Sequence, residues 1–184
     1  MDVAHVEECF PELDAIADSD LRAGVVDAWL AGAGEGGVDD LRAVSWLPPT
    51  ERELGIQGEE SLVAHVRAVV ACARALADAL ADRRGTAVDG DLLVAGALVH
   101  DISKLVEFDG AEPTSTYDLL GHPYHGVHLV AAAGLPVELA HIVLSHTSRT
   151  SVEPAFLEAA LVRRADEIAA TAIRAGAVDD LRNA

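Results

Sequence analysis

The chain has 184 residues, of which 51% are hydrophobic and only 4% aromatic, so it is long enough to bury a sizeable core. Its 31 acidic and 13 basic side chains give a formal net charge of −18, which disfavours general nucleic-acid binding because phosphate backbones would be repelled. The abundance of alanine, leucine and valine favours an all-α protein built from packed helices.

The sequence also lacks the features typical of membrane-spanning or exported proteins and of proteins held together by cysteines. No apolar run is long enough to span a membrane, and the N-terminus has no basic and then apolar signal pattern. The two cysteines, Cys9 and Cys72, are isolated, which indicates neither a disulfide framework nor a cysteine-based zinc site. We therefore expect a cytoplasmic protein with no membrane partner, and we leave a homodimer open.

The first 58 residues are expected to form a helical extension. Apolar residues at helical spacing predict one or two amphipathic helices over residues 2–31. Residues 31–37 are interpreted as a flexible helix exit and not as a phosphate-binding loop, because no strand precedes them and no Gly-Lys-Ser/Thr follows. An irregular connector over residues 50–58 then leads to the main domain, which is expected over residues 59–184.

A strong helix is predicted from Glu59 to about Asp82, because apolar residues recur there at three- and four-residue steps. His65 lies on the same apolar face and is therefore expected to point inward. A single inward histidine is more often a hydrogen-bonded core residue than a metal ligand. Gly85 is expected to cap the end of this helix.

The next apolar run, Leu92–Val99, is followed directly by His100 and Asp101. An ionised carboxylate is almost never fully buried unless it is paired or binds a metal. The two side chains point about 100° apart around a helix axis, which suits two groups that reach round one ion or one group that bridges two ions. Lys104 is the only lysine of the chain, which is consistent with a need for a compact ammonium at this position.

The connection from Leu105 to Gly121 is rich in glycine, proline, serine and threonine. Because long loops inside a compact domain are usually functional or disordered, we predict that it forms a partial lid over a site. Pro123 is expected to start the next helix, on which His122, His125 and His128 recur at steps of three. At most one or two of these three histidines can bind an ion directly.

Two further candidates lie on later helices. His146 is expected to point inward at the end of its helix. The last long helix is predicted over residues 154–175, where Asp166 lies on an apolar stripe. Taken alone, Asp166 could equally form an ion pair with Arg163 or Arg164.

The candidate ligands together make four histidines and two aspartates on five helical segments: His65, His100, Asp101, one histidine of the group that begins at His122, His146 and Asp166. Such a set suits a site in the core of a helical bundle. Nitrogen and oxygen donors favour Mn, Fe, Co, Ni or Zn over Mg or Ca alone. Six ligands are too many for one tetrahedral ion, so we expect two divalent ions.

These stretches resemble the HD-domain superfamily of metal-dependent phosphohydrolases. The resemblance covers about residues 59–172 and rests on the motifs SLVAHVR (61–67), LVHDISK (98–104), LGHP (120–123), VLSH (143–146) and AD (165–166). Glu107, and the pattern Pro-x-x-x-Glu-Ala that begins at Pro154, look most like the HD part of bacterial 3′-to-5′ exoribonucleases. Ser103 stands where the family usually has glycine.

The resemblance implies which residues would bind each of the two ions. One ion would be held by His65, His100, Asp101 and Asp166. Asp101 would bridge to a second ion, which would be held by His122 and His146. His122 is the implied ligand of its group because it lies in the Gly-His-Pro context, and His125 and His128 would lie near the site.

By this resemblance the leading hypothesis is hydrolysis of a phosphomonoester or phosphodiester in a nucleotide or another small phosphorylated metabolite. The expected partner is therefore a small anionic substrate. Asp101 and Lys104 would be catalytic, and Lys104, His125 and Arg149 would bind the substrate. A first alternative is a mixed-valent di-iron oxygenase that cleaves a C–C or C–P bond, for which the cofactor would be iron. A second alternative is a non-catalytic nucleotide-binding module, although such modules usually lack ligands that this chain retains.

Overall fold

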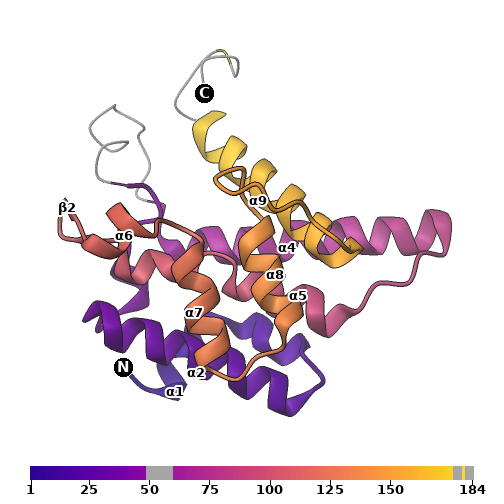
Figure 1. Cartoon of the computed structure of the whole chain (residues 1–184). Coiled ribbons are helices and arrows are strands. Elements are labelled where there is room, and N and C mark those ends of the chain that lie inside the picture. Colours follow the sequence, from indigo (N-terminus) through magenta and orange to yellow (C-terminus); the bar gives the residue numbers. More distant parts are fainter. Residues whose placement is uncertain (49–59, 176–179, 181–184) are drawn as a thin grey trace.

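The computed structural model describes residues 1–48, 60–175 and 180, and nearly all regular structure in this part of the chain is helical (Figure 1). The all-α fold is therefore confirmed. The elements in chain order are α1 (Val3–Cys9), η1 (Pro11–Ala15), α2 (Ser19–Gly36), η2 (Leu41–Ala43), α4 (Leu62–Arg84), α5 (Gly90–Val99), η3 (Ile102–Val106), β1 (Phe108–Asp109), β2 (Glu112–Pro113), α6 (Ser115–Leu119), α7 (Tyr124–Ala132), α8 (Val137–Ser145) and α9 (Leu157–Ala175), where η marks a 3-10 helix. The expected connector and the boundary between residues 58 and 59 lie outside the described residues.

The helix α2 is longer than predicted, because it continues through the glycine-rich stretch as far as Gly36 and ends at Gly37 with a left-handed φ of 64°. These glycines allow a close approach between two segments. A Cβ atom on Gly36 would lie 1.9 Å from the carbonyl oxygen of Leu105 in η3, which no side chain could tolerate. The expectation of a flexible loop over residues 31–37 is therefore wrong, and the stretch serves helix packing.

The helices that carry the His65 and His-Asp motifs have well-defined ends. The Ser61 hydroxyl caps α4 by accepting a hydrogen bond from the backbone N–H of Ala64, and Gly85 ends the helix in the left-handed conformation, as predicted. Asp89 caps α5. Asp91 instead accepts backbone N–H bonds from Ala17 and Asp18, so it fixes the start of α5 against the start of α2.

The connection after the His-Asp pair, which was predicted to be a long loop, contains several short regular elements. It contains η3, a two-residue antiparallel ribbon in which Phe108 pairs with Pro113, and the short helix α6. Gly110, with a φ of 62°, makes the turn of this ribbon. Thr114 caps α6 and also donates a hydrogen bond to the carbonyl oxygen of Val106, which joins the start of α6 to the end of η3.

The cis peptide bond between His122 and Pro123 lies just before α7, which starts at Tyr124. The expectation that all three histidines lie on this helix is therefore wrong, because only His125 and His128 are on α7. This difference separates His122 from the other two histidines.

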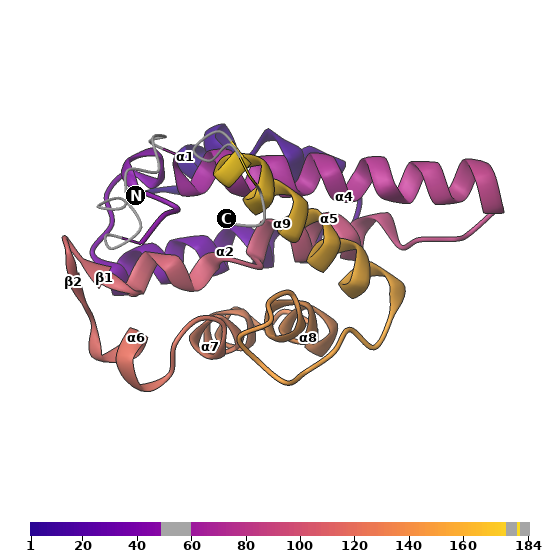
Figure 2. The same ribbon diagram turned by 90° about the horizontal axis from the view of Figure 1, so that it is seen from above.

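The helix α5 lies at the centre of the bundle, in contact with α2, α4, α8 and α9. In the view of Figure 2, α9 lies across α4, while α7 and α8 run together along another side. Buried side chains of the N-terminal helices and of the rest of the described chain form one hydrophobic core, which includes Phe10, Trp29, Leu62 and Leu98. Among the described helices, none is sufficiently long and apolar to cross a membrane.

Candidate metal centre

Three of the predicted ligands form a first group between α4, α5 and α9. His65 is on α4, His100 caps the end of α5 and Asp166 is on α9. The Nε2 atom of His65 lies 3.0 Å from Oδ1 of Asp166, and Nε2 of His100 lies 3.8 Å from the same oxygen. The arginines beside Asp166 pair with other acids, because both contact Glu167. The alternative of a simple Asp166–arginine pair is therefore wrong.

The other three predicted ligands form a second group between η3, the start of α7 and the end of α8. Oδ1 of Asp101 lies 2.8 Å from Nε2 of His122 and 3.5 Å from Nε2 of His146. The two Nε2 atoms are 3.0 Å apart. All three side chains are buried, so their polar atoms face one another with little access to solvent.

Asp101 lies between the two groups and presents a different oxygen to each. Oδ1 faces His122 and His146, whereas Oδ2 lies 3.6 Å from Nε2 of His65 and 3.7 Å from Nε2 of His100. In each group the ligand atoms lie within 4.8 Å of one another, which is close enough to surround an ion. This is the arrangement that a bridging carboxylate requires.

The rings of the histidines are held by hydrogen bonds on the side away from the cluster. Nδ1 of His100 donates to the carbonyl oxygen of Ala97, and Nδ1 of His146 donates to that of Val143, both at 2.7 Å. Because Nδ1 carries the proton in such a neutral ring, the lone pair lies on Nε2. Nε2 of His100 is buried and has no hydrogen-bond partner, which is costly unless a cation occupies the space that it faces. Metal-binding histidines are typically held in this way.

His122 is held by two buried side chains of the connection. Its Nδ1 donates to Oε1 of Glu107 at 2.8 Å. Ser103 Oγ lies 2.9 Å from the same Nδ1 and donates a longer bond, of 3.3 Å, to Glu107 Oε1. The serine that replaces the usual glycine is therefore part of the support for this ring.

The electrostatics differ between the two groups, because they favour a neutral ring at His100 and a charged ring at His122. Burial lowers the pKa of His100 to about 4, so this ring is uncharged near neutral pH. Burial alone would lower the pKa of His122, but Asp101 and Glu107 raise it above its usual value. Burial would likewise raise the pKa of Asp101, yet Lys104 and the two histidines hold it well below its usual range. The Asp101 carboxylate therefore stays charged, and positively charged groups beside it stabilise that charge.

A cavity of about 320 Å³ opens beside this cluster. Its lining residues are Trp46, Asp101, Lys104, His122, His146, Thr147, Ser148, Arg149, Asp166, Glu167, Ala170, Thr171 and Arg174. Lys104 and Arg149 are thus where a substrate-binding role would need them. His125 is not among the lining residues, and its Nε2 lies 2.9 Å from Oε1 of Glu35 on α2.

The predicted lid does not cover this cavity, because no described residue from Leu105 to Gly121 lines it. Phe108 and Gly110 instead line a neighbouring cavity of about 320 Å³, which shares Trp46 and Lys104 with the first. The connection therefore lines the neighbouring cavity and supplies Glu107, which holds the His122 ring.

Sequence reasoning missed Trp46, which contacts the cluster directly. Its Nε1 donates a hydrogen bond of 2.8 Å to Oδ2 of Asp101, and its ring stacks on His65 with 4.2 Å between the ring centroids. The signal that could have drawn attention to it is its rarity, because the chain has only two tryptophans. Arg174 was also missed, and its guanidinium lies 5.9 Å from the Trp46 ring centroid.

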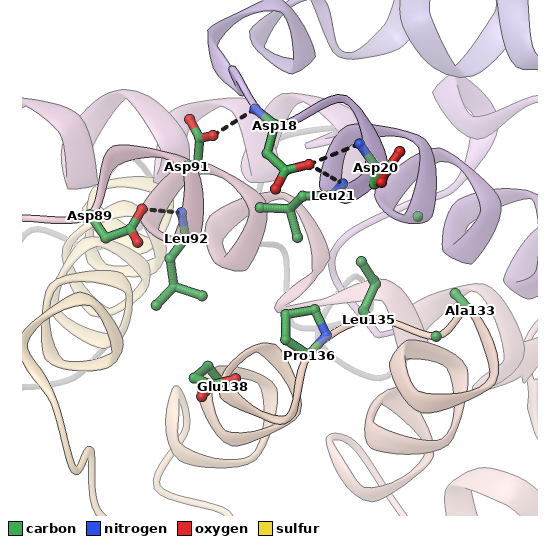
Figure 3. A pocket seen from close by; sticks show the side chains of 12 residues that line it. Asp18, Asp20, Leu21, Asp89, Asp91, Leu92, Ala133, Leu135, Pro136 and Glu138 are labelled. Atoms are coloured by element: carbon green, nitrogen blue, oxygen red, sulfur yellow. Dashed lines mark hydrogen bonds between the residues drawn. The ribbon is translucent and has the colours of Figure 1, made fainter.

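A larger cavity, of about 620 Å³, lies elsewhere, where the starts of α2 and α5 approach the turn between α7 and α8 (Figure 3). Its lining includes several carboxylates. Asp18 caps α2, Asp89 caps α5, and Asp91 accepts two backbone N–H bonds, so these three acids have structural roles. This cavity lacks the inward-facing histidines that distinguish the smaller one.

Comparison with known proteins agrees with the geometry. The family model described as HD domain matches residues 62–171. One similar protein is the dihydroneopterin 2′,3′-cyclic phosphate phosphodiesterase of Methanocaldococcus jannaschii, which is 34% identical over 114 residues. The match covers 59% of this chain and 46% of that relative, so the chain spans less than half of the relative's length. No solved structure matches the chain significantly.

Proposed function

The chain belongs to the HD-domain family, and from that premise we propose that it is a metal-dependent phosphohydrolase that uses two divalent metal ions. The observation that carries this proposal is the division of the Asp101 carboxylate between two sets of ligands. Oδ2 faces the group of His65, His100 and Asp166, and Oδ1 faces His122 and His146. A carboxylate shared in this way is the usual bridge of a two-metal hydrolytic site.

The donor set of each group fits a transition metal. His65, His100 and Asp166 with Asp101 Oδ2 would hold one ion, and His122 and His146 with Asp101 Oδ1 would hold the other. Imidazole and carboxylate together suit Mn, Fe, Co, Ni or Zn. Buried nitrogen lone pairs with no proton to accept, as on His100, support an ion rather than a hydrogen-bond network.

The described residues around the cavity would then bind the phosphoryl group. When bound, the two ions would lower the pKa of water and offset the negative charge of the reacting phosphoryl oxygens. Lys104 and Arg149 bring positive charge to the same cavity, although the chain as a whole carries −18. A small anion is therefore attracted locally to a protein that repels long polyanions.

We propose a phosphodiester of a small, nucleotide-like metabolite as the substrate, with a cyclic phosphate as the first class to test. Two observations support this choice. The similar protein of Methanocaldococcus jannaschii is a cyclic phosphate phosphodiesterase by name. The cavity beside the cluster is about 320 Å³, near the lower end of the usual range for small-molecule sites.

The test is a substrate screen on anaerobically purified protein whose metal content has been measured. Nucleoside 2′,3′-cyclic phosphates, dihydroneopterin 2′,3′-cyclic phosphate and simple aryl phosphates would each be assayed with Mn, Fe, Co, Ni and Zn. The proposal expects turnover without dioxygen, with a phosphomonoester or phosphate as product. Blank assays with every metal, together with an iron-dependent oxidation that needs dioxygen, would replace hydrolysis by the oxygenase alternative.

A further inference from the structure

Trp46 contacts the candidate metal centre, although it lies outside the segment that the HD family model matches. The matched segment begins at residue 62, whereas Trp46 belongs to the N-terminal part of the chain. Two backbone hydrogen bonds attach it to the start of α4: Trp46 N donates to the carbonyl oxygen of Glu60, and Leu62 N donates to that of Val44, both at 2.8 Å. Because α4 carries His65, this attachment sets the tryptophan beside the cluster.

The indole group contacts two predicted ligands by different interactions. Its Nε1 donates to Oδ2 of Asp101 at 2.8 Å. Its ring stacks on the His65 ring at 4.2 Å between centroids, with an angle of 19° between the planes. The Trp46 side chain is buried, at 8% exposure, so both contacts are shielded from water.

The hydrogen bond from Trp46 constrains Asp101, the side chain that the two groups of predicted ligands share. A carboxylate oxygen has two lone pairs, so Oδ2 can accept from Trp46 and still offer the second pair to an ion. The remaining neighbours of Oδ2 are Nε2 of His65 and of His100, at 3.6 and 3.7 Å. Among the described residues, the indole N–H is the donor hydrogen-bonded to Oδ2, while Oδ1 lies 2.8 Å from Nε2 of His122 on the other side of the carboxylate.

We propose that Trp46 is a positioning residue, contributed by the N-terminal part of the chain, that orients the Asp101 carboxylate so that Oδ2 completes the site of His65, His100 and Asp166. This inference rests on the proposed metal centre. It assigns the N-terminal segment a role in the site beyond its place in the hydrophobic core. A packing role alone would need the indole ring but not its N–H group.

The chain contains a matched control for this distinction. Trp29 on α2 is fully buried and packs against Phe10, but its Nε1 has no hydrogen-bond partner. Trp29→Phe and Trp46→Phe therefore remove the same atoms from a buried position. Only the second variant removes a hydrogen bond to a predicted ligand.

The experiment measures metal binding and not turnover. Full-length wild-type protein, Trp46→Phe and Trp29→Phe would be stripped of metal and titrated with Co²⁺ and Mn²⁺, and the folding of each would be checked by thermal unfolding. Loss of a hydrogen bond that orients a ligand typically weakens metal binding by roughly ten- to a hundredfold. We expect this loss for one of the two ions in Trp46→Phe and no change in affinity in Trp29→Phe.

A second measurement needs no Trp46 variant and so remains decisive if that variant does not fold. In the nitrogen–proton correlation spectrum, each indole gives one Nε1–H signal, and the Trp29→Phe protein identifies the signal of Trp46. We expect the Trp46 signal to move on addition of diamagnetic Zn²⁺ and to exchange slowly with solvent.

The outcomes separate the two proposals. Wild-type affinity in a folded Trp46→Phe protein, or a Trp46 signal that ignores Zn²⁺ while the protein binds it, would overturn the positioning role and leave the metal centre intact. Wild-type protein that binds no ion would overturn the metal centre itself, and this role with it.

Discussion

Glu107 accepts a hydrogen bond of 2.8 Å from Nδ1 of His122, and both side chains are buried. The bond turns Nε2 of His122 toward Asp101 and contributes to the raised pKa of the ring. Glutamate therefore acts on the candidate ligand both as a geometric support and as a charge. Each of these effects can be removed by substitution.

Glu107→Gln is expected to weaken binding of the ion on the His122 side while leaving the other ion largely in place. The glutamine can still accept a hydrogen bond, but it carries no charge to favour ligand donation by His122. The expected loss of affinity is roughly tenfold, the lower end for a group that supports a ligand. Anaerobic Co²⁺ titration measures it, with Glu112→Gln on the exposed strand β2 as the control. Equal binding in the two variants would show that Glu107 does not support the site.

Asp101→Ala is expected to abolish binding of both ions, because it removes the carboxylate whose two oxygens face the two groups. Loss of a ligand that served only one group would instead leave the second ion bound. Elemental analysis of the purified protein measures the metal per chain, and Asp109→Ala on strand β1 provides an exposed aspartate for comparison. A variant with full metal content would exclude a bridging role.

The pKa of His100 predicts how acid affects the metal-free protein. The unfolded histidine has a pKa near 6.5, and burial lowers the folded value to about 4. Between these values the unfolded chain binds a proton that the folded chain excludes, so falling pH favours unfolding. The contribution lost by pH 4 is about 3 kcal/mol, on the scale of 1.36 kcal/mol for each pKa unit.

This pH effect can be isolated with a variant that does not titrate. Urea unfolding of metal-free wild type and of His100→Gln at pH 6.5 and at pH 4.5 gives the change in unfolding free energy for each protein. The wild type is expected to lose more stability over this interval, with the difference arising from His100. Parallel losses in the two proteins would mean that the folded ring takes up a proton as easily as the unfolded one.

The sequence predicted the elements that depend on local pattern and missed those that depend on contacts between distant segments. The inward position of His65 and the Gly85 cap followed from helical spacing and turn chemistry, and the structure has both. The length of α2 could not be predicted in this way, because its glycines are explained by the approach of Leu105 from another part of the chain. Trp46 carries no periodic signal, and its role emerges only from its hydrogen bond to a residue 55 positions away.

Lys104 offers the last prediction, because two explanations of its presence differ in their consequences. Lys104 is on the short 3-10 helix η3, where a cation near a helix end gains typically 0.3–1 kcal/mol from the dipole. It also lines the cavity beside Asp101 and His122, and its ammonium lies 5.5 Å from the Trp46 ring centroid. The first explanation concerns stability and the second concerns the substrate.

Lys104→Met separates these explanations. If the ammonium binds the phosphoryl group, the variant should fold and bind metal nearly normally but lose kcat/KM by on the order of a hundredfold, the scale of one lost charge-stabilising donor. If it only stabilises the helix end, turnover should be normal and the melting temperature slightly lower. Lys104→Arg should restore the dipole contribution fully and catalysis only in part, because the guanidinium is larger and planar. Steady-state kinetics on metal-loaded proteins measures the difference, and normal kinetics in the methionine variant would remove Lys104 from the proposed site without affecting the proposed metal ligands.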